Sequence, residues 1–187
     1  MGNRGILHDE SRRILRPWKG KAWVCCVPQY RGVDRKPLFQ PNRYSELFFL
    51  DEVTAFAAGH RPCAYCQRAR FDQFKAAWVQ TNHPDTPSNQ ILVREMDALL
   101  HVSRAVRGGG KITYAAHADD LPDGTFVEVD GVAYLKHGGS YRQWSFDGYG
   151  KTTELPGGVT VVVLTPKPIV QVFAAGFQPL VHGSADA

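Results

Sequence analysis

The stretch Phe48 to Arg70 reads F-F-L-D-E-V-T-A-F-A-A-G-H-R-P-C-A-Y-C-Q-R-A-R and joins a helix stop to a pair of cysteines. Asp51 lies where an acidic residue favours the start of a helix, and Gly59 is a natural residue just beyond a helix end. We therefore predict a helix over about residues 51–58. Pro62 lacks an N–H group and suits the first position of a second helix. The stretch thus predicts a helix–turn–helix joint with two thiols at its turn.

Two thiols spaced as Cys63-x-x-Cys66 can hold one tetrahedral zinc ion, because the turn lets both sulfurs approach to about 2.3 Å from the metal. One such pair supplies half a site, and other sulfur ligands can come only from Cys25 and Cys26. Neighbouring residues of the strand predicted over residues 22–27 point to opposite faces, so these two cysteines do not easily serve one site together. We predict a zinc site made by Cys26, Cys63 and Cys66.

The fourth ligand and the alternatives to zinc stay open at this point. The fourth ligand could be Cys25 through a distorted backbone, a histidine such as His60 or His8, or a water molecule. Without a metal, Cys63 and Cys66 would pack as small buried residues. As a redox pair they would gain from a lowered thiol pKa at a helix start, but that arrangement follows a sheet strand in oxidoreductases, whereas here a helix and a turn precede it.

The run L-D-E-V-T-A-F-A-A-G-H-R-P-C-A-Y-C-Q-R, residues 50–68, resembles the second half of the zinc-binding domain of the Ada DNA-repair protein and of related small metal-binding modules. The resemblance covers roughly residues 22–70. It implies that Cys63 and Cys66 join an earlier cysteine pair around zinc, and that arginines near them, here Arg61, contact the DNA backbone. In Ada itself, one of the earlier cysteines accepts a methyl group from a DNA phosphotriester.

The chain departs from the Ada pattern at the early cysteines. The family spaces that pair apart, whereas Cys25 and Cys26 are adjacent in this sequence. Residues 71–187 show no resemblance of this kind.

The net charge of +4 is unevenly distributed along the chain. Residues 1–45 contain ten Lys or Arg against three acids, for a net charge of +7, and residues 46–187 have a net charge of −3. A concentrated basic end is typical of a polyanion-binding face whose attraction fades with added salt, and a solvated basic hairpin is the alternative. Within it, the proline-containing run 31–44 is expected to be a loop. The predicted nucleic-acid contacts are Arg12, Arg13, Arg16, Lys19, Arg31, Arg61 and Arg68.

The second half of the chain predicts one more long helix followed by short strands. The helix is expected over about residues 88–107 and ends at three glycines, residues 108–110, which could also form a hinge or a phosphate-approaching loop. Turn-forming residues such as Asp130-Gly131 then separate short alternating segments, which is a strong hairpin signal. The predicted strands are 125–129, 132–136, 141–145 and 159–165, and a last helix follows to about Gly176.

These elements predict an α+β fold. We expect an N-terminal β-meander over residues 5–31 plus three helices, followed by a small antiparallel sheet or barrel with a C-terminal helix. The expected domains are a basic Ada-like α+β subdomain with a helical extension, residues 1–110, and an antiparallel β subdomain with a closing helix, residues 111–187. The two are expected to form one compact unit.

A second candidate site is centred on His117 and Asp119, in the connection that leaves the third predicted helix. Connections often carry functional groups, and a His/Asp pair there could serve a hydrolase or nuclease. The spacing of the two residues matches no known catalytic pattern. Histidines beside acidic residues are also frequent on protein surfaces. The other residues able to do acid–base work are His101, Asp120 and His137. The strand 141–145 mixes aromatics with arginine, a pattern found in base-stacking strands and more often in cores.

Composition limits the broad class of protein. With 43% hydrophobic and 21% charged residues the chain resembles a soluble globular protein. No apolar run approaches the roughly 20 residues that cross a bilayer, and the N-terminus lacks the apolar core of a signal peptide, so we expect a cytoplasmic protein without a membrane partner. Four clustered cysteines are too few for a disulfide-rich secreted scaffold.

The functional prediction is an Ada-like, zinc-stabilised nucleic-acid-binding protein linked to DNA repair or DNA processing, with DNA as the favoured partner. It predicts salt-sensitive DNA binding that Arg61→Ala weakens. The first alternative is a hydrolase or nuclease that acts on nucleic acid or modified nucleotides near His117. The second alternative is a non-catalytic protein-interaction module, which would expose a large apolar patch.

Overall fold

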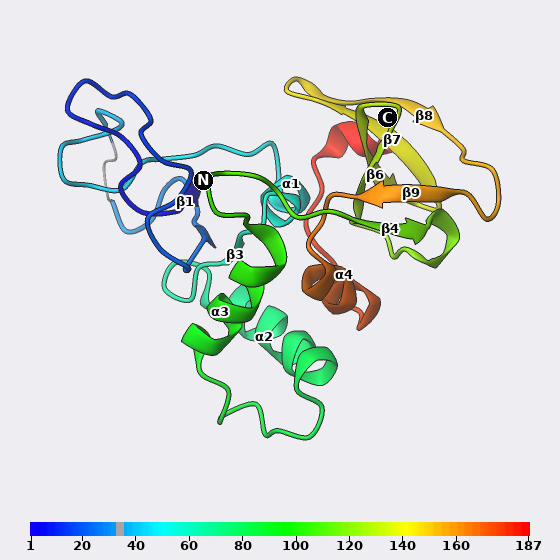
Figure 1. Cartoon of the computed structure of the whole chain (residues 1–187), viewed down its shortest axis with the longest axis horizontal. Helices are drawn as coiled ribbons and strands as arrows, with labels where there is room; N and C mark the ends of the chain where they lie inside the picture. Colours follow the sequence, from blue (N-terminus) through cyan, green and yellow to red (C-terminus); the bar gives the residue numbers. More distant parts are fainter. Residues whose placement is uncertain (33–35) are drawn as a thin grey trace.

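The computed structural model describes residues 1–32 and 36–187 and shows an α+β fold (Figure 1). Val33, Asp34 and Arg35, which belong to the predicted loop 31–44, lie outside the described residues. N-terminal loops and a small sheet occupy one end of the molecule, a six-stranded sheet occupies the other, and helices lie between and beneath them. In the described part of the chain, no helix combines the length and apolar character needed to cross a bilayer.

The small sheet is mixed, with the order β1 (Gly2–Asn3), β2 (Val24–Cys25) and β3 (Arg61–Pro62). β1 pairs antiparallel with β2, whereas β2 pairs parallel with β3. The β-meander predicted over residues 5–31 is therefore not formed. Most of that segment is irregular loop, because the second neighbour of β2 comes from the cysteine motif instead of from an adjacent hairpin.

The first predicted helix is present as α1 (Glu52–Ala57). The Asp51 side chain caps it by accepting the Thr54 N–H at 2.8 Å, which satisfies one of the unpaired donors at a helix start. Gly59 has φ of 82°, the left-handed conformation that stops a helix and that glycine adopts most easily. Local sequence therefore accounts for both ends of α1.

The second helix, α2 (Arg68–Asn82), begins later than predicted. Pro62 lies in β3 and not at the helix start, so that part of the prediction is wrong. The N–H groups on either side of Pro62 bond to β2 and its flank: Arg61 N to Trp23 O at 3.1 Å and Cys63 N to Cys25 O at 2.9 Å. Proline suits the intervening position because it has no N–H to satisfy.

The helical core is formed by α1, α2, α3 (Val93–Arg104) and α4 (Lys167–Ala174). α3 is shorter at both ends than the predicted 88–107, and α4 starts after Pro166, which stands at its N-cap position. Large side chains that are almost fully buried fill this core. They are Phe56, Phe71, Phe74, Trp78, Met96, Leu100 and Ile169.

The six-stranded sheet is antiparallel throughout, in the order β4-β9-β5-β6-β7-β8. It is open, with β4 and β8 as edges, so the barrel alternative is not realised. The predicted strands correspond to β5, β6, β7 and β9, while β4 and the glycine-containing β8 were not predicted. Their bounds are β4 (Tyr114–His117), β5 (Phe126–Val129), β6 (Val132–His137), β7 (Ser140–Ser145), β8 (Gly148–Thr153) and β9 (Thr160–Val163).

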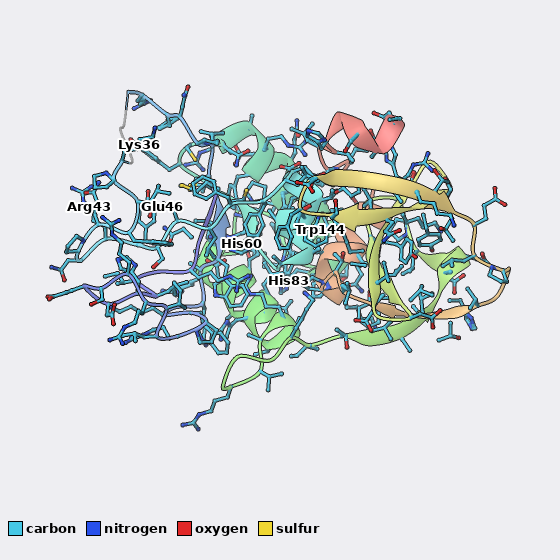
Figure 2. All side chains as sticks on the ribbon, turned by 90° about the horizontal axis from the view of Figure 1, so that it is seen from above. Lys36, Arg43, Glu46, His60, His83 and Trp144 are labelled. Atoms are coloured by element: carbon cyan, nitrogen blue, oxygen red, sulfur yellow. The ribbon has the colours of Figure 1, made fainter. Side chains whose placement is uncertain are left out.

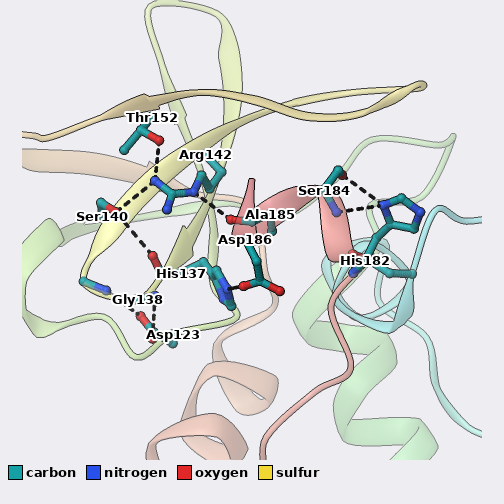
Figure 3. Close-up of polar contacts among 12 residues, drawn as sticks. Asp123, His137, Gly138, Ser140, Arg142, Thr152, His182, Ser184, Ala185 and Asp186 are labelled. Carbon is teal, nitrogen blue, oxygen red and sulfur yellow. Dashed lines mark hydrogen bonds and ion pairs between the residues drawn. The ribbon is translucent and has the colours of Figure 1, made fainter.

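The C-terminal segment, ending in the 3₁₀ turn η2 (Gly183–Asp186), docks on the β6–β8 side of this sheet (Figure 3). Arg142 Nε donates to the Ala185 carbonyl at 2.8 Å, and His137 Nε2 lies 2.7 Å from Asp186 Oδ1. Asp123 accepts the Gly138 N–H at 2.9 Å and closes the neighbouring turn. Arg142 and His137 thus attach the chain end to the sheet.

Candidate metal centre

The pairing of β2 with β3 brings the two cysteine segments together. Parallel pairing sets Cys25 opposite Pro62, so Cys63, the first residue after β3, follows that pair on the same side as Cys26, the first residue after β2. Gln67 strengthens the junction, because its Nε2 donates to the Cys25 carbonyl at 2.8 Å and its N–H to the Cys63 carbonyl at 3.0 Å. The two thiol-bearing turns are therefore fixed by main-chain bonds and not by the thiols alone.

The sulfurs of Cys26, Cys63 and Cys66 all lie within 4.8 Å of one another. All three residues are partly buried. Cys26 is tied at its own backbone, where its N–H donates to the Met1 carbonyl at 2.6 Å and its carbonyl accepts from the Met1 amino group at 2.9 Å. This is the group of three that the sequence predicted.

Hydrogen bonds and burial shift the pKa values of the three thiols in opposite directions. The Cys26 thiol donates to Cys63, and the N–H groups of Cys66 and Tyr65 point at the same sulfur, which lowers the pKa of Cys63 to about 4 against the opposing effect of burial. Donating to Cys63 and being buried raise the pKa of Cys26. Burial also raises the pKa of Cys66. The hydrogen bonds to Cys63 therefore favour its thiolate form, and those same bonds favour the protonated form of Cys26.

This donor set fits a soft divalent metal such as zinc. Tetrahedral zinc with bonds of about 2.3 Å requires sulfur–sulfur separations of about 3.8 Å, and the three sulfurs here lie within 4.8 Å of one another. The thiolate is the form that binds a metal, so a bound metal would displace the thiol protons. The three thiols supply three of four tetrahedral positions.

The other proposed ligands do not join the described cluster. Cys25 does not belong to the three-cysteine group found among the described residues, and burial raises the pKa of its thiol. His8 Nδ1 lies 2.5 Å from Ser45 Oγ. His60 is completely buried, and burial, reinforced by the charges of Arg4 and Arg104, lowers its pKa well below the usual value. Figure 2 shows His60 in the interior between the two ends of the molecule.

Arg61, predicted to contact nucleic acid, is buried. It is 4% exposed and forms a two-pronged ion pair with Asp97, with N–O distances of 2.7 and 2.8 Å. Its remaining terminal nitrogen donates to the Pro62 carbonyl at 3.0 Å. The bonds to Asp97 hold β3 against α3. Arg61 therefore stabilises the joint from inside the protein.

An exposed aromatic pair beside the thiols was not predicted from the sequence. Tyr65, between the two motif cysteines, is 69% exposed, and its ring centre lies 5.3 Å from that of Tyr30 in an edge-to-face arrangement. The Arg31 guanidinium lies 5.2 Å from the Tyr30 ring and 5.9 Å from the Tyr65 ring. We call Tyr30, Arg31 and Tyr65 the aromatic cluster. An aromatic residue inside a C-x-x-C turn was the available signal.

The remaining predicted basic contacts are exposed. Arg12, Arg16, Lys19 and Arg31 form no ion pair within the part of the chain that the structure describes, while the exposed Arg13 and Arg68 pair weakly with acids on their own segments. Most lie on the N-terminal loops, at the end of the molecule away from the large sheet (Figure 1). Figure 2 places Lys36 and Arg43 at that same end. The basic end of the sequence is thus also a basic end of the structure.

His117 and Asp119 hold a turn together. His117 Nδ1 lies 3.0 Å from the Gly158 carbonyl oxygen, and the Asp119 carboxylate accepts the Gly158 N–H at 2.7 Å. Both residues therefore fix the loop before β9, and no hydrogen bond joins their side chains among the described contacts. This arrangement gives no support to a catalytic pair.

No family model, no curated protein and no solved structure matches the chain. The likeness to the Ada zinc-binding domain therefore remains a resemblance carried by residues 50–68. What the geometry supports is narrower, namely three cysteines placed so that they could hold a metal ion.

Proposed function

We propose that this chain is a zinc-stabilised nucleic-acid-binding protein that presents the aromatic cluster and its neighbouring arginines to the ligand. The observation that carries this proposal is the position of Tyr65. It is exposed, it pairs with Tyr30 beneath Arg31, and it is held between two cysteines of the candidate metal centre.

The metal centre and the aromatic cluster have different roles in this proposal, and each role follows from the chemistry of its residues. A metal bound by the three thiolates fixes the Cys63–Cys66 turn, and with it the direction of the Tyr65 ring. Exposed aromatic rings stack on unpaired bases, and an adjacent guanidinium adds attraction to both the base and the phosphate. The aromatic cluster therefore suits a single-stranded or unstacked segment of nucleic acid.

Long-range attraction would come from the N-terminal loops. Residues 1–45 have a net charge of +7, and several of their arginines are exposed without ion-pair partners among the described residues. Such a surface attracts phosphate backbones and loses that attraction in salt. The resemblance to the Ada domain makes DNA the favoured partner and DNA repair or processing the expected setting.

The test is binding of fluorescently labelled single-stranded and duplex DNA over a range of salt concentrations, with zinc-loaded protein. Tyr65→Ala should weaken single-strand binding by about 1–3 kcal/mol, the usual contribution of one stacked base. Arg31→Gln should reduce the slope of log affinity against log salt by about one. The single-strand preference should decrease in the tyrosine variant.

Matched controls exist on the large sheet and its turns. Phe146, in the turn between β7 and β8, is an aromatic residue that is 89% exposed, and Lys151 is an exposed cation on β8. Phe146→Ala and Lys151→Gln should leave the affinity unchanged. Affinity that responds neither to salt nor to Tyr65→Ala and Arg31→Gln contradicts the proposal.

A further inference from the structure

A cavity of about 220 Å³ lies on a different part of the molecule, where the N-terminal loop, the end of α1 and the glycine-rich loop after α3 meet. Its lining includes three cations, Arg4, Arg104 and Lys111, and two aromatic residues, Trp18 and Trp23. None of these residues contributes to the cysteine cluster. The cavity therefore needs an explanation of its own.

The three cations converge on the end of α1. Arg4 donates to one main-chain carbonyl there at 3.0 Å, Lys111 to another at 2.5 Å, and Arg104 to a third. The accepting carbonyls belong to Ala58, Ala57 and Gly59, respectively. The ordinary explanation is that these cations cap a helix C-terminus, which attracts positive charge.

Helix capping accounts for only part of this charge. A helix end carries about half a negative charge, against three positive charges here. None of the three cations forms an ion pair among the described residues. The charge of Asp97 acts on Arg104 and raises its pKa, but both carboxylate oxygens of Asp97 already accept hydrogen bonds from Arg61. The cavity thus has a surplus of positive charge.

Burial makes this surplus unfavourable in the protein alone. Desolvation lowers the pKa of Arg4 to about 10, and desolvation with repulsion from Arg4 lowers the pKa of Arg104 to about 9. Desolvation and the Arg4 charge also lower the pKa of Lys111 to about 8, although the residue as a whole is exposed. An anion in the cavity would relieve both effects.

Arg104 provides an independent indication of a ligand. The residue is only 2% exposed, and its Nε–H is buried without a hydrogen-bond partner among residues 1–32 and 36–187. Its guanidinium lies 4.2 Å from the centre of the Trp23 ring, and that of Arg4 lies 4.0 Å from the same ring. Packing on Trp23 holds both planar groups in place, and a buried donor without a partner normally has one supplied by a ligand or by water.

We propose that this cavity binds a phosphate group through Arg4, Arg104 and Lys111. Two guanidinium groups and an ammonium group offer several charge-assisted donors to a compact dianion, which matches phosphate better than a singly charged carboxylate. Gly109 and Gly110 line one side, so the main chain approaches the cavity without side chains in the way. The phosphate is either free or carried by a nucleotide whose remaining part lies against Trp18. This inference does not rest on the nucleic-acid function proposed above.

Thermal unfolding and calorimetry in potassium phosphate, compared with potassium chloride at equal ionic strength and neutral pH, test the site. Phosphate should raise the Tm of the wild-type chain by binding the folded state. Lys111→Met should weaken phosphate binding by at least about tenfold, the effect of losing one charge-assisted hydrogen bond. Lys151→Met, which removes an exposed lysine from β8, should leave phosphate binding unchanged.

A second pair of variants keeps the test decisive if Lys111→Met does not fold. Arg4→Lys retains the positive charge and should keep most of the phosphate affinity, whereas Arg4→Gln should lose it. No phosphate-specific effect in the wild-type chain, or an effect that survives both Lys111→Met and Arg4→Gln, overturns the proposal.

Adenosine monophosphate distinguishes the two sources of the phosphate. Tighter binding of the nucleotide than of inorganic phosphate, with a change in tryptophan fluorescence, identifies a nucleotide ligand. Equal affinities identify free phosphate. Both outcomes support the site, and an absence of binding by both compounds contradicts it.

Discussion

The chain ends two helices with nearly the same sequence, F-A-A-G-H-R-P at residues 56–62 and F-A-A-G-F-Q-P at residues 173–179. In both, the glycine has positive φ, 82° at Gly59 and 94° at Gly176. Its N–H bonds to the carbonyl three residues back at 2.8 and 2.9 Å, and the following N–H to the carbonyl five residues back at 2.9 and 3.2 Å. The two helix stops are therefore the same local structure.

The surroundings of the two stops differ. After Gly59 the chain pairs with β2, buries Arg61 and delivers two cysteines to the thiol cluster, whereas Gln178 at the equivalent of Arg61 is exposed. A Cβ at Gly59 would meet Arg104, while one at Gly176 would meet open space among the residues that the structure describes. The comparison shows that a short local sequence determines how a helix ends, and that long-range partners determine whether a site forms there.

Removing a thiol should produce the largest difference between the two joints. We expect Cys63→Ser to abolish tight zinc binding and to remove at least about 5 kcal/mol of metal-dependent stability, since a structural zinc site contributes its binding free energy to folding. Cys25→Ser changes the residue next to Cys26 and is the matched control. This variant should keep both the tight zinc binding and the metal-dependent stability. Zinc titration and thermal unfolding measure this, and equal behaviour of the two variants contradicts the assignment.

Arg61→Met should destabilise the folded state by about 3–5 kcal/mol, because it leaves the buried Asp97 carboxylate without its partner. The equivalent change after the second stop, Gln178→Met, should cost less than about 0.5 kcal/mol. Adding Asp97→Leu to Arg61→Met should recover part of the loss, as measured by urea unfolding. An Arg61→Met protein of normal stability with weakened DNA binding would instead support the phosphate contact that the Ada resemblance implies.

Alanine at the two stop glycines gives a smaller but closely matched comparison. Both substitutions force a side chain into the left-handed region, which costs about 1–2 kcal/mol. A Cβ at Gly59 would also lie 2.6 Å from Arg104 Cδ, while one at Gly176 would meet no atom within 4 Å. Gly59→Ala should therefore cost about 1–3 kcal/mol more than Gly176→Ala in chemical unfolding. Equal costs would mean that the Arg104 packing does not constrain the first stop.

The smallest expected effect is a pH dependence at the cations around the first stop. Lys111 has a folded-state pKa of about 8, below the value of about 10.4 in an unfolded chain. Between these values the unfolded state binds more protons, so stability should rise with pH in wild type relative to Lys111→Met. Phosphate should flatten this difference by raising the folded-state pKa. Chemical unfolding of both chains across that pH range tests the sign, and a difference that falls with rising pH contradicts it.

Elements governed by local signals were predictable from the sequence. Asp51 and Gly59 mark the ends of α1, and Asp130-Gly131 marks the β5–β6 hairpin, because capping and turn chemistry act within a few residues. The edge strand β8 was missed because its glycines and polar residues lack the alternating pattern of a half-buried strand.

The parts that failed depend on partners distant in the sequence. Pro62 has the local features of a helix start, yet pairing with β2 about 40 residues earlier in the chain places it in a strand. Arg61 was predicted to contact nucleic acid, and its buried ion pair with Asp97, 36 residues away, was not predicted. Sequence spacing cannot reveal such pairings, since tertiary context overrides local preference.

The candidate metal centre was predictable because strand alternation separates Cys25 from Cys26 and leaves one of them to join Cys63 and Cys66. The aromatic cluster was not, because Tyr30 and Tyr65 meet only after the two cysteine segments pair. The cavity beside Trp23 was not predictable from the sequence for the same reason. Its three cations come from three segments that no local pattern connects.

Native mass spectrometry of the wild-type chain and two cysteine variants tests the central claim most directly. The account predicts one zinc ion per chain in the wild type and in Cys25→Ser, and none in Cys26→Ser. A folded wild-type chain that binds no metal when zinc is supplied, or zinc retained by Cys26→Ser, would contradict it.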